Sequence, residues 1–426
     1  MRKRLRVVTL GCSKNTVDTE HLLAQLPADA FEIVDGDEPV DCLLLNTCGF
    51  IGDAKEESVN AILEAVEAKK RGEAGAVIVF GCLSQRYPDE LAAEIPEVDA
   101  WFGARDLSPL LRHLGVEPGP FVTRRLTESK GYAYLKISEG CDRRCSYCAI
   151  PLIRGAHRSV PMEDLVAEAE SLVARGVKEL ILIAQDTTYY GLDLYGRRAL
   201  GELVGRLSAI PGLVWIRIHY SYPEGFPEDV LEVMAHNPKV CKYLDIPLQH
   251  IADPVLDRMR RHVDGAWTRA LIARLRREVP GVALRTTLIV GHPGETQEAF
   301  EELLAFVREA RFERLGAFMY SEEEGTWGAE HFADDVPPEV KQARLDALME
   351  LQREISLECN RARIGTEVTV MVDGFSHTAI CRSEYESPEV DGEILVRGVA
   401  PSVQVGDMIR VRIVAAEEYD LIAEAL

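Results

Sequence analysis

Short apolar runs alternate with amphipathic helical stretches over residues 1–119 of this 426-residue chain. Such alternation is typical of an open parallel sheet flanked by helices. We expect strands at Arg6–Gly11, Leu43–Thr47 and Ala76–Gly81, and helices near Asn15–Gln25, Asp53–Lys70 and Arg86–Ile95.

A cysteine directly follows each of these three predicted strands: Cys12, Cys48 and Cys82. Parallel strands place their carboxyl ends along one edge of a sheet, where ligands bind. The three cysteines are therefore predicted to meet in space as a set of three thiolates. Three unrelated buried thiols are the alternative, because cysteine is often buried. Cys42, at the entry end of its strand, is interpreted as a packing residue.

The same alternation repeats on a larger scale from about Glu128. Helical stretches separate six further runs, and six β/α units predict a partial barrel of the TIM type. An amphipathic helix over 337–361 has the spacing to pack against it. The predicted strands are Tyr132–Ser138, Glu179–Asp186, Trp215–Tyr220, Lys242–Leu248, Ala283–Gly291 and Arg314–Tyr320.

Past Gly365 the chain consists of short β-rich runs punctuated by glycine, at Glu367–Val372, Glu393–Val396 and Met408–Val414. These runs predict a small all-β barrel. The predicted fold class is α/β, with an open parallel N-terminal domain (1–119), a partial (β/α)6 barrel (127–360) and a C-terminal β-barrel (361–426).

The formal net charge of −22 argues against a surface that tracks phosphates and favours a basic partner. Residues 362–426 carry twelve Asp and Glu against five Arg and no Lys. We expect this barrel to dock a basic protein, partly through Glu384–Glu393, and not nucleic acid. A solvated acidic surface without a partner is the alternative.

Hydrophobic residues make up 47% of the chain, but no apolar run approaches the length that spans a bilayer. The opening residues lead into a predicted strand and not into a signal peptide. A cytoplasmic protein without a membrane partner is expected. In that reducing compartment the ten cysteines are expected to be metal ligands or buried thiols, not disulfides.

A second cysteine set is local: Cys141, Cys145 and Cys148 have the spacing C-x3-C-x2-C, with Tyr147 just ahead of the last thiol. An iron–sulfur cube that only carries electrons has four protein ligands, yet the next cysteine is Cys241. One iron would stay open to a reacting ligand. The spacing is similar to that of radical S-adenosylmethionine enzymes, whose open iron binds that cofactor. A zinc site with a distant fourth ligand, or three unconnected thiols, is the alternative.

Polar residues that end the later strands are further candidates, although each could instead satisfy loop backbone. Gly291, Pro293 and Gly294 follow a strand, and glycine lets a ligand approach the backbone. An ordinary turn is the alternative there. The loop Arg154–Arg158 could orient an acidic group or carry surface charges. The predicted cofactor-binding set is Tyr147, Gln185, Arg217, Gln249, Gly291 and Glu295.

The whole chain resembles the methylthiotransferase family, in the order N-terminal domain, radical cofactor core and TRAM domain. The resemblance is carried by four motifs: TLGCSKNTVDTE at Thr9–Glu20, NTCGFI at Asn46–Ile51, ISEGCDRRCSYCAIPLIRGAHRS at Ile137–Ser159 and DTTYYG at Asp186–Gly191. Ser13 stands where many relatives have proline, and Val160 where they usually have arginine; neither is a predicted ligand. The tRNA-modifying branch differs after the second N-terminal cysteine and after the core cysteines.

The resemblance implies two [4Fe-4S] clusters, an auxiliary one on Cys12, Cys48 and Cys82 and a radical-generating one on Cys141, Cys145 and Cys148, with S-adenosyl-L-methionine as cofactor. It implies insertion of a methylthio group at the β-carbon of an aspartate in small-subunit ribosomal protein twelve, with an external electron donor and a sulfur donor. No side-chain base usefully removes hydrogen from that carbon, so the reaction needs a radical, supplied when S-adenosylmethionine is cleaved. The N-terminal domain is expected to cap the barrel rim, so that both clusters face one pocket.

Three alternatives remain at this point. A tRNA adenosine methylthiotransferase would use the same clusters, but needs Lys and Arg on its TRAM domain. A zinc-binding scaffold would bind no iron. A radical methylase with the core cluster alone would leave Cys12, Cys48 and Cys82 dispensable.

Overall fold

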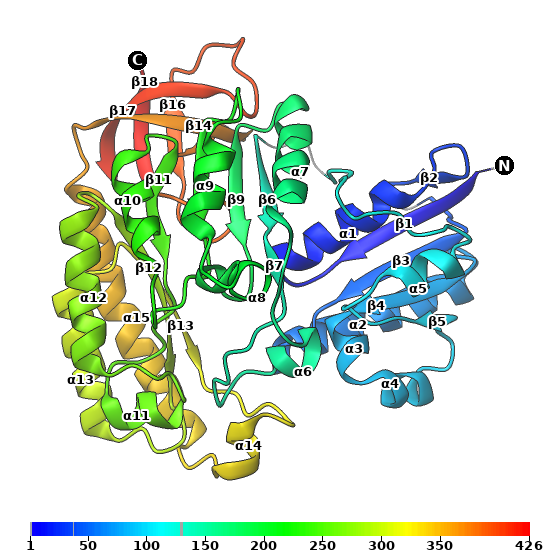
Figure 1. Ribbon diagram of the computed structural model, residues 1–426, viewed down its shortest axis with the longest axis horizontal. Coiled ribbons are helices and arrows are strands. Elements are labelled where there is room, and N and C mark those ends of the chain that lie inside the picture. Colours follow the sequence, from blue (N-terminus) through cyan, green and yellow to red (C-terminus); the bar gives the residue numbers. More distant parts are fainter. Residues whose placement is uncertain (1, 37, 128–130) are drawn as a thin grey trace.

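The structure, a computed structural model, describes residues 2–36, 38–127 and 131–426; Glu128, where the second repeat was expected to begin, lies outside them. It contains a five-stranded sheet, a six-stranded sheet and a closed five-stranded barrel (Figure 1). The predicted fold class is therefore confirmed. Among the described residues no helix combines the length and the apolar character needed to cross a membrane.

The N-terminal sheet is parallel throughout, with the order β2-β1-β3-β4-β5. Every residue of β3 is buried, as expected for a parallel strand covered on both faces. The strands β2 and β5 were not predicted because three and two residues are too few to show a pattern. The elements are β1 Lys3–Thr9, α1 Ser13–Gln25, β2 Phe31–Ile33, β3 Cys42–Thr47, α2 Gly52–Lys70, β4 Val77–Gly81, α3 Cys82–Arg86, α4 Pro88–Glu94, β5 Ala100–Trp101 and α5 Ser108–His113.

The core sheet is also parallel, with the order β13-β12-β11-β10-β9-β6, and it stays open as a partial barrel. Side-chain caps fix two of its helix starts: Asp264 accepts from the amide of Trp267, and Thr296 from that of Ala299. The strands are β6 Tyr132–Lys136, β9 Glu179–Ile183, β10 Trp215–Ile218, β11 Val240–Asp245, β12 Ala283–Val290 and β13 Arg314–Met319, with a hairpin of β7 Ser138–Glu139 and β8 Arg158–Ser159.

Helices cover the outer face of this sheet, where leucine, isoleucine and valine side chains form one continuous core cluster. The final helix α15 packs along β13 and contributes the buried Leu348 and Ile355. The helices are α6 Ile150–Arg154, α7 Met162–Ala174, the 3-10 helix η1 Thr187–Tyr189, α8 Leu192–Tyr195, α9 Leu200–Ser208, α10 Glu228–His236, α11 Asp253–Arg258, α12 Gly265–Glu278, α13 Gln297–Ala310, α14 Trp327–His331 and α15 Pro338–Arg361.

The C-terminal barrel closes the amino ends of the core strands (Figure 1, orange to red). Gly131, just before β6, lies against Gly406. Lys178, just before β9, forms an ion pair with Asp407. The loop with Cys141, Cys145 and Cys148 lies at the opposite, carboxyl ends of the core strands. The barrel strands are β14 Glu367–Phe375, β15 Ala379–Arg382, β16 Ile394–Arg397, β17 Met408–Ala416 and β18 Leu421–Ala425.

Two carboxylates of the acidic segment Glu384–Glu393, those of Glu386 and Asp391, are buried against the core, so the predicted docking role is wrong for these two; Glu389 and Glu393 are exposed, and for them docking stays a prediction. Glu386 is 1% exposed and pairs with Arg314 and Arg363. The Asp391 side chain, also 1% exposed, lies 3.6 Å from Arg285. The sequence shows the charges of this segment but not the arginines that neutralise them.

We expect Glu386→Gln to destabilise the protein, because Arg314 and Arg363 lose their shared carboxylate. Burial raises the pKa of Glu386, but Arg363 and Arg314 outweigh it and hold the pKa at about 2, below its ordinary 4.5. The stability that this depressed pKa contributes is present above pH 4.5 and is lost as the pH falls toward 2. A lowering of the Glu386 pKa by two to three units corresponds to a contribution of about 3 kcal/mol to the free energy of unfolding at neutral pH.

Urea unfolding at neutral pH and near pH 3 checks this prediction. The difference between wild type and Glu386→Gln should shrink on acidification. Glu418→Gln, at an exposed position of the same barrel, is the matched control and should cost little at either pH. A Glu386→Gln penalty that does not change with pH would contradict the assignment.

Candidate active site

The structure brings the three N-terminal cysteines to one edge of the first sheet. The strands β1, β3 and β4 are neighbours, and Cys12, Cys48 and Cys82 follow their carboxyl ends. At Gly11, φ is +93° and an added Cβ would lie 2.8 Å from the Cys48 Cβ, so only glycine lets the Cys12 loop pass Cys48. Cys12 is exposed, whereas Cys48 and Cys82 are buried.

The three thiols are close enough to influence one another's protonation. Burial raises the pKa of Cys82 to about 12. Arg154 lowers this pKa, whereas Cys12 and Cys48 raise it further. Burial is also the main cause that raises the pKa of Cys48. Any metal group that binds here must displace thiol protons, so its binding releases protons.

The second set lies in the loop between β7 and α6, at the carboxyl end of β6. Backbone hydrogen bonds fold this loop: the Cys141 amide donates to the Gly155 carbonyl at 3.0 Å, and the Cys148 amide to the Cys145 carbonyl at 3.2 Å. Burial raises the pKa of Cys141 to about 12, with a further rise from Cys145. Cys145 and Cys141 likewise raise the pKa of Cys148, although burial is the larger cause.

An arginine missed by the sequence analysis lies beside this second set. Arg261, 3% exposed, directs one guanidinium nitrogen to Cys145 Sγ at 3.6 Å and to the Tyr147 hydroxyl at 3.3 Å. Tyr222 stacks under the same guanidinium, with 4.1 Å from Cζ to the ring centroid. The basic run at 258–261 was the sole signal in the sequence, and such runs are usually solvent-exposed.

Arg154 joins the segment that follows the second cysteine set to Cys82 of the first. It ends α6, six residues after Cys148, and its Nε lies 3.3 Å from Cys82 Sγ. Its other nitrogens bond Asp18 at 2.7 Å and Asn15 at 2.6 Å, both on α1. The guanidinium is 2% exposed, so the alternative of a surface charge does not hold for this residue.

Lys136 completes this junction from the end of β6. It pairs with Asp18 and, at 2.7 Å, with Glu139. Glu139 also accepts from Gln185 at 3.0 Å and pairs with Arg154. The amino-terminal sheet is thus joined to the rim of the core by a buried ionic network, consistent with its predicted capping position.

The predicted cofactor contacts fall into three groups. Tyr147, Gln185 and Gln249 lie at the carboxyl-end rim, and neither Gln185 Oε1 nor Gln249 Oε1 has a hydrogen-bond partner among the described residues. Gly291 has a φ of +74° and donates its amide to Glu295. Glu295 accepts from this loop through Oε2, while its Oε1 lies 3.2 Å from Arg344 and receives no hydrogen bond among the described residues. Burial raises the pKa of Glu295 to about 7, although Arg344 lowers it.

Arg217 does not lie at the rim, contrary to the prediction. It is fully buried, and its Nε donates to Glu179 at the start of β9 at 2.8 Å. The other two nitrogens donate to the Ser383 and Glu384 carbonyls of the C-terminal barrel. Its long side chain runs from mid-strand toward the amino end, which a strand position alone does not reveal.

The donor sets fit iron–sulfur clusters, because thiolates in sets of three are the ligands such clusters take and a cubane spreads its cysteine ligands over different irons. Arg154 and Arg261 supply positive charge beside each thiol set, as an anionic cluster requires. Gln185 Oε1, Ser221 Oγ and Gln249 Oε1 offer unpaired polar atoms for a polar cofactor.

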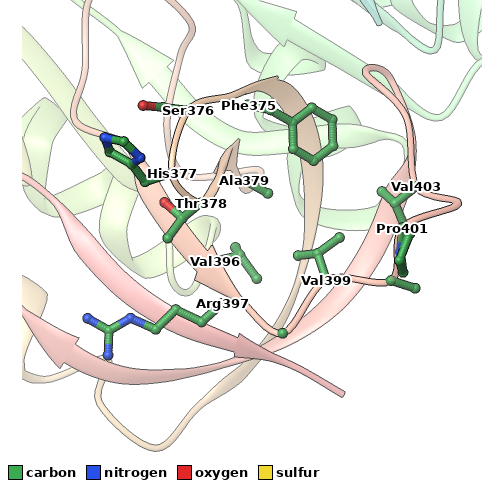
Figure 2. A pocket seen from close by; sticks show the side chains of 12 residues that line it. Phe375, Ser376, His377, Thr378, Ala379, Val396, Arg397, Val399, Pro401 and Val403 are labelled. Atoms are coloured by element: carbon green, nitrogen blue, oxygen red, sulfur yellow. The ribbon is translucent and has the colours of Figure 1, made fainter.

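A separate cavity of about 550 Å³ lies on the C-terminal barrel (Figure 2). Phe375, Val399 and Val403 line one side, with His377 and Arg397 across from them. None of its lining residues belongs to a cysteine-bearing loop. The cavity is not part of the candidate active site.

Family models match three successive parts of the chain. The Uncharacterized protein family UPF0004 matches residues 4–103, the Radical SAM superfamily 135–307 and the TRAM domain 364–426. Among solved structures, the radical S-adenosylmethionine methyltransferase TsrM from Kitasatospora setae aligns over 77% of each chain, with a TM-score of 0.59 at 16% identity. The core is thus a radical S-adenosylmethionine fold.

Curated relatives match from end to end. The ribosomal protein uS12 methylthiotransferase RimO of Phocaeicola vulgatus is 51% identical over 430 residues, covering 100% of both chains. The RimO protein of Porphyromonas gingivalis is 53% identical over 431 residues, covering 99% of both. This chain belongs to the RimO family of methylthiotransferases.

Proposed function

We propose that this protein inserts a methylthio group at the β-carbon of an aspartate in ribosomal protein uS12, the small-subunit protein twelve. The relatives that match at about half identity over their whole length are named as methylthiotransferases of ribosomal protein uS12. The observation in the structure that supports it most is Arg154, which lies six residues after Cys148 and contacts Cys82 and Asp18 of the N-terminal domain in one buried junction. A tRNA substrate has no comparable support.

We assign the two thiol sets to two [4Fe-4S] clusters, with Cys12, Cys48 and Cys82 holding the auxiliary one and Cys141, Cys145 and Cys148 the other. When bound, the clusters and S-adenosylmethionine would supply electrons, the radical and the methylthio sulfur. Arg154 and Arg261 would stabilise anionic clusters through N–H to sulfur contacts. Gln185 and Gln249 would orient the polar groups of S-adenosylmethionine.

The division of labour along the chain is part of the proposal. Residues 1–119 would hold the auxiliary cluster and exclude water from the rim, and residues 127–360 would bind the cofactor. Residues 361–426 would seal the amino ends of the core strands and contact the basic substrate elsewhere on their surface. An external reductant and a sulfur donor are required, and a cytoplasmic location fits a ribosomal substrate.

Mass spectrometry of uS12 after anaerobic incubation with reconstituted enzyme, S-adenosylmethionine and reductant tests the proposal. We expect a gain of one methylthio group on one aspartate, absent when reductant is omitted. Unfractionated tRNA is incubated in parallel as the competing substrate. Methylthiolated adenosine together with unmodified uS12 would overturn the proposal.

A further inference from the structure

Lys14 is a buried cation that crosses from the N-terminal sheet to the rim of the core. It is the second residue of α1, two positions after Cys12, and is 8% exposed. Its Nζ lies 3.1 Å from the centroid of the Tyr220 ring. Tyr220 follows the carboxyl end of β10 and has a φ of +56°. Its amide donates to Asp245 at 3.0 Å, which fixes the ring under the ammonium.

The ammonium has no ionic partner in residues 2–36, 38–127 and 131–426, and no acceptor there receives a hydrogen bond from it. Two other lysines of the described residues that reach between the sheets do have such partners: Lys136 binds Asp18 and Glu139, and Lys55 binds Glu323 at 2.9 Å. Buried charges in proteins are normally paired. The Tyr220 ring offsets part of the desolvation cost, but it cannot accept the three hydrogen bonds of an ammonium.

The amino end of α1 adds positive potential at the same place. This thirteen-residue helix has no side-chain cap and no acidic residue in its first turn. The amides of Asn15 and Thr16 donate to the Cys12 carbonyl, but the helix dipole at this end still favours an anion. The nearest acidic side chain of the helix, Asp18, is already taken by Lys136 and Arg154. An anion entering here would therefore meet both the helix end and an unpaired ammonium.

We propose that Lys14 binds the carboxylate of the substrate aspartate, and so positions that side chain and selects it. The inference rests on the proposed function and names the substrate-recognition residue of the same site. An aspartate held at Lys14 lies between the Cys12 loop and the strand ends that carry Tyr220 and Ser221. Neutral side chains, and an adenine base, lack the charge that Lys14 needs.

A double-mutant cycle on the reconstituted holoenzyme tests the proposal. The variants are Lys14→Met, which keeps the aliphatic stem, and Lys14→Arg, which keeps the charge. The ligands are uS12 and a uS12 variant whose modified aspartate is replaced by asparagine. Loss of one charge-assisted hydrogen bond should weaken binding about tenfold. Lys70→Met, at an exposed lysine on α2, is the control and should bind like wild type.

The expected signature is coupling between the two changes. Wild-type enzyme should bind the asparagine variant of uS12 about tenfold more weakly than uS12, and Lys14→Met should bind uS12 about tenfold more weakly than wild type does. Lys14→Met with the asparagine variant should bind no more weakly than either single change. Lys14→Arg should recover most of the affinity, and affinity for S-adenosylmethionine should not change. The assignment would be overturned if the two affinity losses multiply, if Lys14→Met loses no affinity for uS12, or if it loses affinity only for S-adenosylmethionine. If wild type does not methylthiolate uS12, the proposed function itself fails.

Discussion

Replacing Cys48 with alanine is expected to abolish methylthio transfer and to lower the iron content from about eight to about four atoms per chain. Cys48 is 9% exposed, directly follows β3 and lies against the Gly11 turn that leads into Cys12. Two remaining thiols on one sheet edge provide too few ligands to hold a cluster. Iron analysis and mass spectrometry of uS12 measure the two effects.

Cys42→Ala is the matched control for this prediction. Cys42 begins β3, whereas Cys48 directly follows the other end of that strand. Cys42 is likewise buried, at 6% exposed. The Cys42→Ala variant should keep about eight irons per chain and full methylthio transfer. Its stability should fall only modestly, because a small buried side chain is lost. Undiminished transfer by Cys48→Ala would instead favour a radical methylase that uses the core cluster alone.

Replacing Arg154 with methionine is expected to destabilise the protein by about 3–5 kcal/mol, because buried carboxylates would lose their partner. Asp18 and Glu139 both pair with this guanidinium, and Lys136 alone would remain to neutralise them. The effect should be largest on the contact between the N-terminal sheet and the core. Urea unfolding followed by circular dichroism, with limited proteolysis near residues 119–127, measures it.

Arg158→Met is the control for Arg154, since Arg158 is an exposed arginine four positions further along the chain. It should change the free energy of unfolding by less than about 0.5 kcal/mol. A similarly small change for Arg154→Met would mean that the ionic junction does not hold the two parts together.

The cysteines could be placed from the sequence because strand ends and local spacing determine where they lie. Cys12, Cys48 and Cys82 follow three apolar runs, and parallel pairing of β1, β3 and β4 brings those ends together. The six β/α repeats were equally regular, since each core strand is marked by a buried apolar run. Local pattern therefore predicted the fold class and the two thiol sets.

The charged residues could not be placed in this way, because their partners lie far away in the sequence. Arg217 reaches Ser383 and Glu384, and Glu386 reaches Arg314. Arg154 was noted as a possible surface charge, yet it pairs with Asp18 across 136 positions. A strand or loop position gives only the location of the Cα atom of a long side chain. Tertiary contacts determine where its charged group lies.

An iron anomalous-scattering map of crystals of the reconstituted protein tests the central claim most directly. The account predicts two clusters, one on Cys12, Cys48 and Cys82 and one on Cys141, Cys145 and Cys148, both on the side where the N-terminal sheet meets the carboxyl ends of the core strands. A map with iron at only one set, or with the auxiliary cluster facing away from the core strands, would contradict it.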